Sequence, residues 1–373
     1  MNNTAPPKQY NNIKNGKIEL LRFVFCVFVL LFHLNKFVLY LPETYFDLHL
    51  TFFKNGAIGV EFFFLVSGFL MAKSIYKKIS ESKTESQGKA LSRDYLNFIK
   101  RKYLAIFPYH LVAFAITALI FVLLNRLEGA PLYKYLFGSL PDLLLIQMSG
   151  IKMFSPNSFE WYISSMLLAM VVLYPTCLRY YYRFTRFFAP VAALLILGGL
   201  QVMTSCLSGN IDDWIYVAFK TNFRAIAEIM LGTTAFEISR RLQKIEFSQK
   251  QLGALSALEV FSFAAVCFFT VSDWGYNYQA VFLIFIFVLV TLAFTRFSEK
   301  KSIFDNRLCY FLGSLSLPLY LAQAAAIYIT LSLGEFPRNI YTLSFSLVLT
   351  LAFGLIVRSV GDKLNMGIKK LTC

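Results

Sequence analysis

Three ionisable residues near the start of the chain have types and spacing suited to acid–base chemistry. Arg22 and His33 lie eleven residues apart in one apolar segment, so on a helix they share a face about 16 Å apart along the axis. Glu61 lies in the next apolar segment, which returns in the opposite direction. His33 and Glu61 are each predicted about 12–14 Å below the same end of this helix pair. A carboxylate bonded to one imidazole nitrogen raises the basicity of the other, which is the arrangement of a general base.

Two other interpretations of His33 and Glu61 stay open at this point. Polar side chains also bond across membrane helices purely as packing devices. Ionisable residues inside membrane spans also form the proton relays of transporters. The residues alone therefore leave a catalytic pair, a packing device and a relay as alternatives.

Further along the chain, four residues are weaker candidates for a site. Arg224 and Glu228 lie four positions apart, where side chains on one helix meet and can neutralise each other. Trp161 and Tyr162 open another apolar segment and are typical of anchors at the membrane interface.

The other two histidines, His49 and His110, have no partner at helical spacing, and we predict that both are interfacial. The six cysteines are scattered and form no C-x-x-C pair, so the sequence predicts neither a disulfide framework nor a metal site.

The elements that must position these residues follow from composition. Of the 373 residues, 57% are hydrophobic and 15% are charged, whereas a soluble domain carries about a quarter charged residues. A membrane-spanning helix needs about 20 apolar residues. The segment 140–148 is apolar but too short, and we predict an interfacial or re-entrant piece there. We predict an all-α polytopic membrane bundle, one domain over 1–373, with about ten spans near 18–41, 52–72, 104–125, 159–178, 188–207, 219–238, 252–272, 277–296, 310–332 and 341–361.

The net charge of +15 has a distribution that argues against a nucleic-acid partner. Of the 36 Lys and Arg residues, 26 fall in alternate segments that share a side with the N-terminus, and 4 fall in the remaining loops. Because cytoplasmic loops carry the excess of positive charge, both termini are predicted to lie inside.

Two strings near the N-terminus resemble the acyltransferase 3 family of integral membrane acyltransferases. The first is Glu19-Leu-Leu-Arg22 with His33 eleven residues on, and the second is Gly59-Val-Glu61-Phe-Phe-Phe-Leu-Val-Ser67-Gly68-Phe69-Leu70. Weaker features extend the resemblance over most of the chain: Arg101 with Pro108, Trp161 to Ser164 leading to Pro175, Arg224 with Gly232, and Gly313 to Ser316 leading to Tyr320. Three positions depart from the residues that the family often has, namely Ala105 for Arg, Met166 for Glu and Gln323 for His.

The resemblance implies transfer of an acyl group, usually acetyl from acetyl-CoA, to a hydroxyl of an extracytoplasmic or lipid-linked glycan. It implies a location in the bacterial cytoplasmic membrane, with acetyl-CoA as co-substrate, and neither a permanently bound cofactor nor a metal is expected. Its site residues on this chain would be His33 and Glu61 for catalysis, either as a base pair or with His33 carrying the acyl group. Donor binding would use Arg22, Arg101 and Ser67, and the acceptor or oxyanion would be held by Arg224, Trp161, Tyr162 and Tyr320. The alternative is a proton-coupled transporter or glycan flippase that uses Arg22, His33 and Glu61 as a relay.

Overall fold

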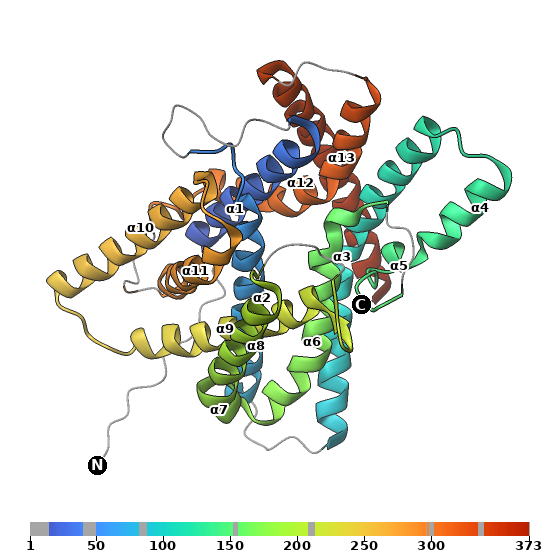
Figure 1. Ribbon diagram of the computed structural model, residues 1–373. Helices are drawn as coiled ribbons and strands as arrows, with labels where there is room; N and C mark the ends of the chain where they lie inside the picture. Colours follow the sequence, from blue (N-terminus) through green and yellow to red (C-terminus); the bar gives the residue numbers. More distant parts are fainter. Residues whose placement is uncertain are drawn as a thin grey trace, which may run out of the picture.

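The computed structural model describes residues 15–39, 50–81, 88–151, 156–207, 213–295, 297, 302–334 and 339–372. The described residues are almost entirely helical, and the strands found among them are two residues long each and pair in one hairpin (Figure 1). The elements are α1 (Gly16–Leu34), η1 (Asn35–Leu39), η2 (Gly56–Ile58), α2 (Gly59–Glu81), α3 (Gly88–Leu124), α4 (Gly129–Gly138), α5 (Leu140–Leu143), η3 (Ser158–Glu160), α6 (Trp161–Arg179), α7 (Tyr181–Arg183), η4 (Phe184–Phe188), α8 (Ala189–Thr204), β1 (Trp214–Ile215), β2 (Ala218–Phe219), α9 (Lys220–Leu242), α10 (Gln249–Val271), η5 (Tyr276–Tyr278), α11 (Gln279–Phe294), α12 (Arg307–Ser332) and α13 (Ile340–Thr372).

The predicted all-α membrane architecture is confirmed. Within the described ranges, eight helical segments are long and apolar enough to cross a bilayer. Two further helices, α9 and α11, occupy predicted spans without meeting that standard. The first carries Arg224 and Glu228 among its core residues, and the second has 16 residues. The predicted number of ten spans therefore stays a prediction.

Burial separates the helices into an inner and an outer group. The most apolar windows of α2 and α12 are 78% and 72% buried, whereas those of α3, α8, α10 and α13 are 22–28% buried. The outer helices thus present apolar side chains outward, as a surface facing lipid does. In Figure 1, α2 lies near the middle of the molecule, and α4 and α10 extend to opposite edges.

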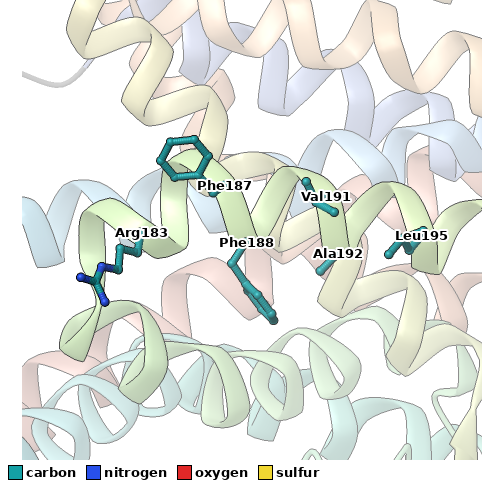
Figure 2. Close-up of a pocket in the computed structure, with 6 residues that line it drawn as sticks. All are labelled: Arg183, Phe187, Phe188, Val191, Ala192 and Leu195. Carbon is teal, nitrogen blue, oxygen red and sulfur yellow. The ribbon is translucent and has the colours of Figure 1, made fainter.

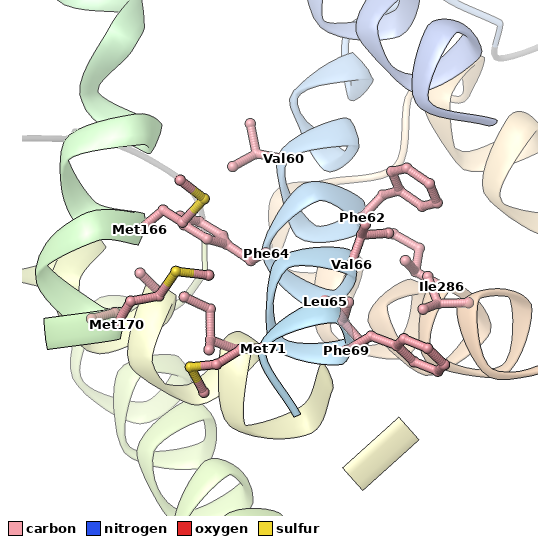
Figure 3. Packing of buried hydrophobic residues seen from close by; sticks show 14 of the residues in the cluster. Val60, Phe62, Phe64, Leu65, Val66, Phe69, Met71, Met166, Met170 and Ile286 are labelled. Carbon is pink, nitrogen blue, oxygen red and sulfur yellow. The ribbon is translucent and has the colours of Figure 1, made fainter. Parts of the chain in front are cut away.

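Helix α2 is the centre of the core because most of its faces meet another helix. In Figure 3, Phe62 and Phe69 lie on the side toward Ile286 of α11, and Phe64 lies on the side toward Met166 of α6. Gly68 lies so close to α9 that a Cβ there would collide with the Ile229 carbonyl. Small residues let membrane helices approach at backbone distance, and here they place α9 directly against α2.

Helices α1 and α2 form the predicted antiparallel hairpin. Gly56 and Gly59 lie against the backbone of α1 at Phe28 and Phe25, so the hairpin closes tightly. Asn15 is the N-cap of α1, and its side chain accepts hydrogen bonds from the backbone N–H groups of Lys17 and Ile18. Its last turn passes into the π-helical segment η1, a conformation that is frequent at functional sites.

The segment 140–148 is confirmed as too short to span. It forms α5 and following turns, and it buries Asp142, Leu145 and Met148 inside the protein. Its interfacial or re-entrant character stays a prediction.

A shallow groove of about 690 Å³ runs along α7, η4 and α8 (Figure 2). Arg183 lies at one end, and the rest of the lining is Phe187, Phe188, Val191, Ala192 and Leu195. No predicted site residue lines this groove, and its apolar walls suit lipid chains, so the candidate site is sought elsewhere.

Candidate active site

His33 is held at the end of α1 by a residue from the other end of the chain. Its Nδ1 lies 2.8 Å from the side-chain oxygen of Gln323 on α12. With that oxygen as acceptor, Nδ1 carries the proton and Nε2 carries the free lone pair. The imidazole is buried and lies 4.6 Å from the ring of Phe159. Among the described residues no hydrogen bond to Nε2 is formed, which leaves that atom available for substrate.

The predicted hydrogen bond between His33 and Glu61 is wrong. Glu61 instead accepts hydrogen bonds from Arg224 on α9 and Gln279 on α11. The reason is the rotation of α2, because Phe62 stacks on Phe25 of α1 with ring centroids 4.2 Å apart. The preceding residue points about 100° away around the helix, which directs Glu61 toward α9 and α11.

Glu61 belongs instead to a buried charged cluster. Arg224 bonds both to Glu61 and, at 2.9 Å, to Glu228 one turn along α9, as its spacing predicted. The guanidinium also lies 5.8 Å from the ring of Trp161, a cation–π distance. When ionised, Arg224, Glu61 and Glu228 together carry two negative charges and one positive charge. The second carboxylate oxygens of Glu61 and Glu228 have no hydrogen-bond partner in the described structure.

A line of polar side chains continues from His33 toward the other end of α1. The Tyr320 hydroxyl donates to the carbonyl of Phe159, the residue whose ring touches His33. The rings of Tyr320 and Tyr162 meet edge to face at 5.8 Å. The Ser67 hydroxyl lies 3.1 Å from the Met166 sulfur, and the Tyr162 hydroxyl lies 3.7 Å from it.

Arg22 stands at the far end of this line. Its guanidinium bonds to Glu19 at 3.1 Å, and its side chain is 34% exposed. It is within Coulomb range of both Tyr162 and Lys102. Because Arg22 is partly exposed, it can bind an anion that arrives from solvent.

Arg101 does not join Arg22. Its side chain is exposed, and its Nε donates to the Asn97 carbonyl of the same helix at 3.3 Å. The next residue on α3, Lys102, is near enough to Arg22 for the two charges to interact. Helix rotation decides which of two adjacent side chains points inward, so the sequence alone could not distinguish Lys102 from Arg101.

His110 has no partner at helical spacing, but the structure supplies one from another element, and its predicted interfacial place stays a prediction. It is fully buried and forms an ion pair with Glu160 of η3. The two residues are fifty positions apart, so no local sequence pattern indicates that they pair. A buried histidine–carboxylate pair thus exists in this protein, but its members differ from the predicted ones. His49 lies outside the described residues.

In the described part of the chain, no group of three or more His, Cys, Asp or Glu is placed to hold a metal ion.

Comparison with known proteins gives one match. A family model described as an acyltransferase domain matches residues 15–358, nearly the whole chain. Neither the curated proteins nor the solved structures gave a significant match. The matched range includes every residue of the site described above.

Proposed function

The chain belongs to the acyltransferase 3 family, and on this basis we propose that it moves an acetyl group from cytoplasmic acetyl-CoA to a hydroxyl of an extracytoplasmic or lipid-linked polysaccharide. It is an integral membrane protein. Its proposed place is the bacterial cytoplasmic membrane with both termini inside, in keeping with the distribution of Lys and Arg.

One observation carries the proposal, namely the line of polar groups along α1. Arg22 lies at one end, and Tyr162 and Tyr320 lie between it and His33 at the other end, whose Nε2 bonds to none of the described residues. The two ends are about 16 Å apart along the helix, a length that a pantetheine arm can bridge. Arg22 and Lys102 would hold the phosphates of CoA, and the thioester would reach His33.

In the proposed step, Nε2 of His33 takes the proton from the acceptor hydroxyl as the oxygen attacks the thioester carbonyl carbon. The new C–O bond forms, the C–S bond breaks, and the thiolate of CoA leaves and takes up a proton. In the second route, Nε2 attacks the thioester carbonyl carbon, the C–S bond breaks and the thiolate of CoA leaves. The acceptor hydroxyl then attacks the acetyl carbon, the N–C bond breaks, and Nε2 takes the hydroxyl proton. Both routes need the same free lone pair, which the Gln323 contact leaves on Nε2.

Glu61 takes a different role from the one its spacing predicted. Since it bonds to Arg224, we assign it to hold that guanidinium beside Trp161, where the cation would face the acceptor or the developing oxyanion. Ser67 would support the donor side through the Met166 sulfur, which the Tyr162 hydroxyl also contacts.

The test uses the purified protein in liposomes with acetyl-CoA labelled in the acetyl group. Transfer of label to envelope glycan, located by mass spectrometry, is the expected result. A proton-coupled transporter or a flippase would neither consume acetyl-CoA nor acetylate glycan, so the absence of both activities in protein that binds glycan would overturn the proposal in favour of transport.

A further inference from the structure

The buried pair of His110 and Glu160 is not used by the proposed reaction. His110 lies on α3, and Glu160 ends the short helix η3. Both side chains are fully buried, where an ion pair needs excellent partners to repay the loss of water. Such a pair between an outer helix and a three-residue turn requires an explanation.

Neither residue is placed to react with substrate. Nε2 of His110 lies 3.1 Å from the Leu143 carbonyl, and Nδ1 faces the Glu160 carboxylate. The other carboxylate oxygen of Glu160 accepts from the Asn157 side chain. With both ring nitrogens engaged by protein, His110 differs from His33, whose Nε2 is unoccupied in the described structure.

The segment that this pair holds touches both parts of the candidate site. Phe159 packs its ring on His33 and receives the Tyr320 hydroxyl at its carbonyl. Trp161, the residue directly after Glu160, lies over the guanidinium of Arg224. Residues 157–161 therefore join the imidazole to the charged cluster, and we name them the η3 bridge.

Two further hydrogen bonds hold the Asn157 end of the η3 bridge in place. The Asn157 backbone N–H donates to Asp142 of α5 at 3.0 Å, and its side chain donates to the Leu321 carbonyl of α12 at 3.1 Å. Glu160 and its partner His110 are the anchor at the opposite end, next to Trp161.

We propose that His110 and Glu160 are positioning residues, which lock the η3 bridge so that Phe159 orients His33 and Trp161 orients Arg224. This inference rests on the proposed acyl transfer for its kinetic readout, but its structural readout is independent of it. A displacement of about 1 Å in a reacting group can cost on the order of 100-fold in rate, so a loosened bridge should lower kcat without weakening donor binding.

The experiment compares His110→Ala, Glu160→Gln and the double variant His110→Gln/Glu160→Gln in a Trp214→Phe/Trp274→Phe background, where Trp161 is the single tryptophan. The matched control is Thr117→Val, a conservative change at a buried residue of the same helix. We expect His110→Ala to lower kcat at least about tenfold, to leave the KM for acetyl-CoA within about twofold, and to shift Trp161 emission to the red. The double variant, which keeps two neutral hydrogen-bonding side chains, should recover part of both signals.

Unchanged Trp161 emission in a monodisperse His110→Ala protein would overturn the positioning role, and so would a normal kcat. If His110→Ala does not fold, the same two readouts on Glu160→Gln decide the question. Failure of the background protein itself to transfer acetyl would contradict the proposed function, while the emission comparison would still test the bridge.

Discussion

The Nδ1 atom of His33 lies 2.8 Å from the side-chain oxygen of Gln323, a residue 290 positions away. This contact joins α1 to α12 and gives the imidazole a defined tautomer. The partner is a neutral amide, whereas the spacing of the N-terminal helices predicted a carboxylate. An amide orients the ring but stabilises the imidazolium less than a carboxylate would.

Replacement of Gln323 should therefore affect the rate more than donor binding. Gln323→Leu removes the acceptor and lets the ring adopt the tautomer that lacks a lone pair on Nε2. Since a positioned general base contributes roughly 10²–10⁴-fold, we expect kcat to fall at least about tenfold at an unchanged KM for acetyl-CoA. Steady-state kinetics in liposomes measure both constants. A rise in KM alone would instead place Gln323 at the donor.

Gln323→Glu offers a second test of the same contact. A carboxylate at this place would favour the protonated imidazole, so the group must lose its proton at a higher pH before it can act as a base. We expect the rising limb of the kcat profile to move to higher pH relative to the wild type. An identical profile would contradict a role for His33 as the titrating base.

We expect substitutions of Arg224 and Glu228 in the charged cluster to have opposite effects on stability. Arg224→Gln leaves Glu61 and Glu228 buried without their shared cation, which should cost about 3–5 kcal/mol of stability. Glu228→Gln removes the excess negative charge and keeps the shape, so the melting temperature in detergent should stay level or rise. A Glu228→Gln protein that melts as early as Arg224→Gln would show that this charge count is wrong.

Donor binding should discriminate between two adjacent cations of α3. Lys102 is within Coulomb range of Arg22, whereas Arg101 is exposed and bonds to its own helix. We expect Arg22→Ala and Lys102→Ala to weaken acetyl-CoA binding in calorimetric titrations, each by about tenfold, because a charge-assisted hydrogen bond is lost. Arg101→Ala is the matched control. If Arg101→Ala weakens donor binding as much as Arg22→Ala does, Arg101 has the donor role that the sequence predicted.

The close approach of α2 and α9 makes Gly68 sensitive to any side chain. A Cβ there meets the Ile229 carbonyl, so Gly68→Leu should separate the helices and reduce the yield of monodisperse protein strongly. Gly198 on α8 has no atom within 4 Å of an added Cβ, and Gly198→Leu should be produced at the wild-type level. Equal yields would refute the packing of α2 against α9.

The membrane fold could be predicted from the sequence because apolar length and the positions of Lys and Arg are local properties. The hairpin of α1 and α2 could also be predicted, because its two helices are consecutive in the sequence. Helix α9 also followed, although Arg224 and Glu228 make it too polar for a simple apolarity rule. Their pairing at four positions was confirmed because helical spacing is independent of tertiary structure.

The partners of the buried polar groups could not be predicted, since they depend on helix rotation. Glu61 points away from His33 because Phe62 occupies the face against α1. His110 found its partner fifty positions away, and no spacing within one helix encodes such a contact. The residue types that do chemistry were visible in the sequence, whereas the geometry that pairs them required the packed bundle.

The central claim is that His33 acts on the acyl group through its free Nε2. The most direct measurement compares acetyl transfer by wild-type protein and His33→Ala in the same liposomes, with acetyl-CoA binding measured on both. We expect His33→Ala to bind acetyl-CoA as the wild type does but to transfer acetyl at least about 100-fold more slowly. Transfer at the wild-type rate by the variant would contradict it.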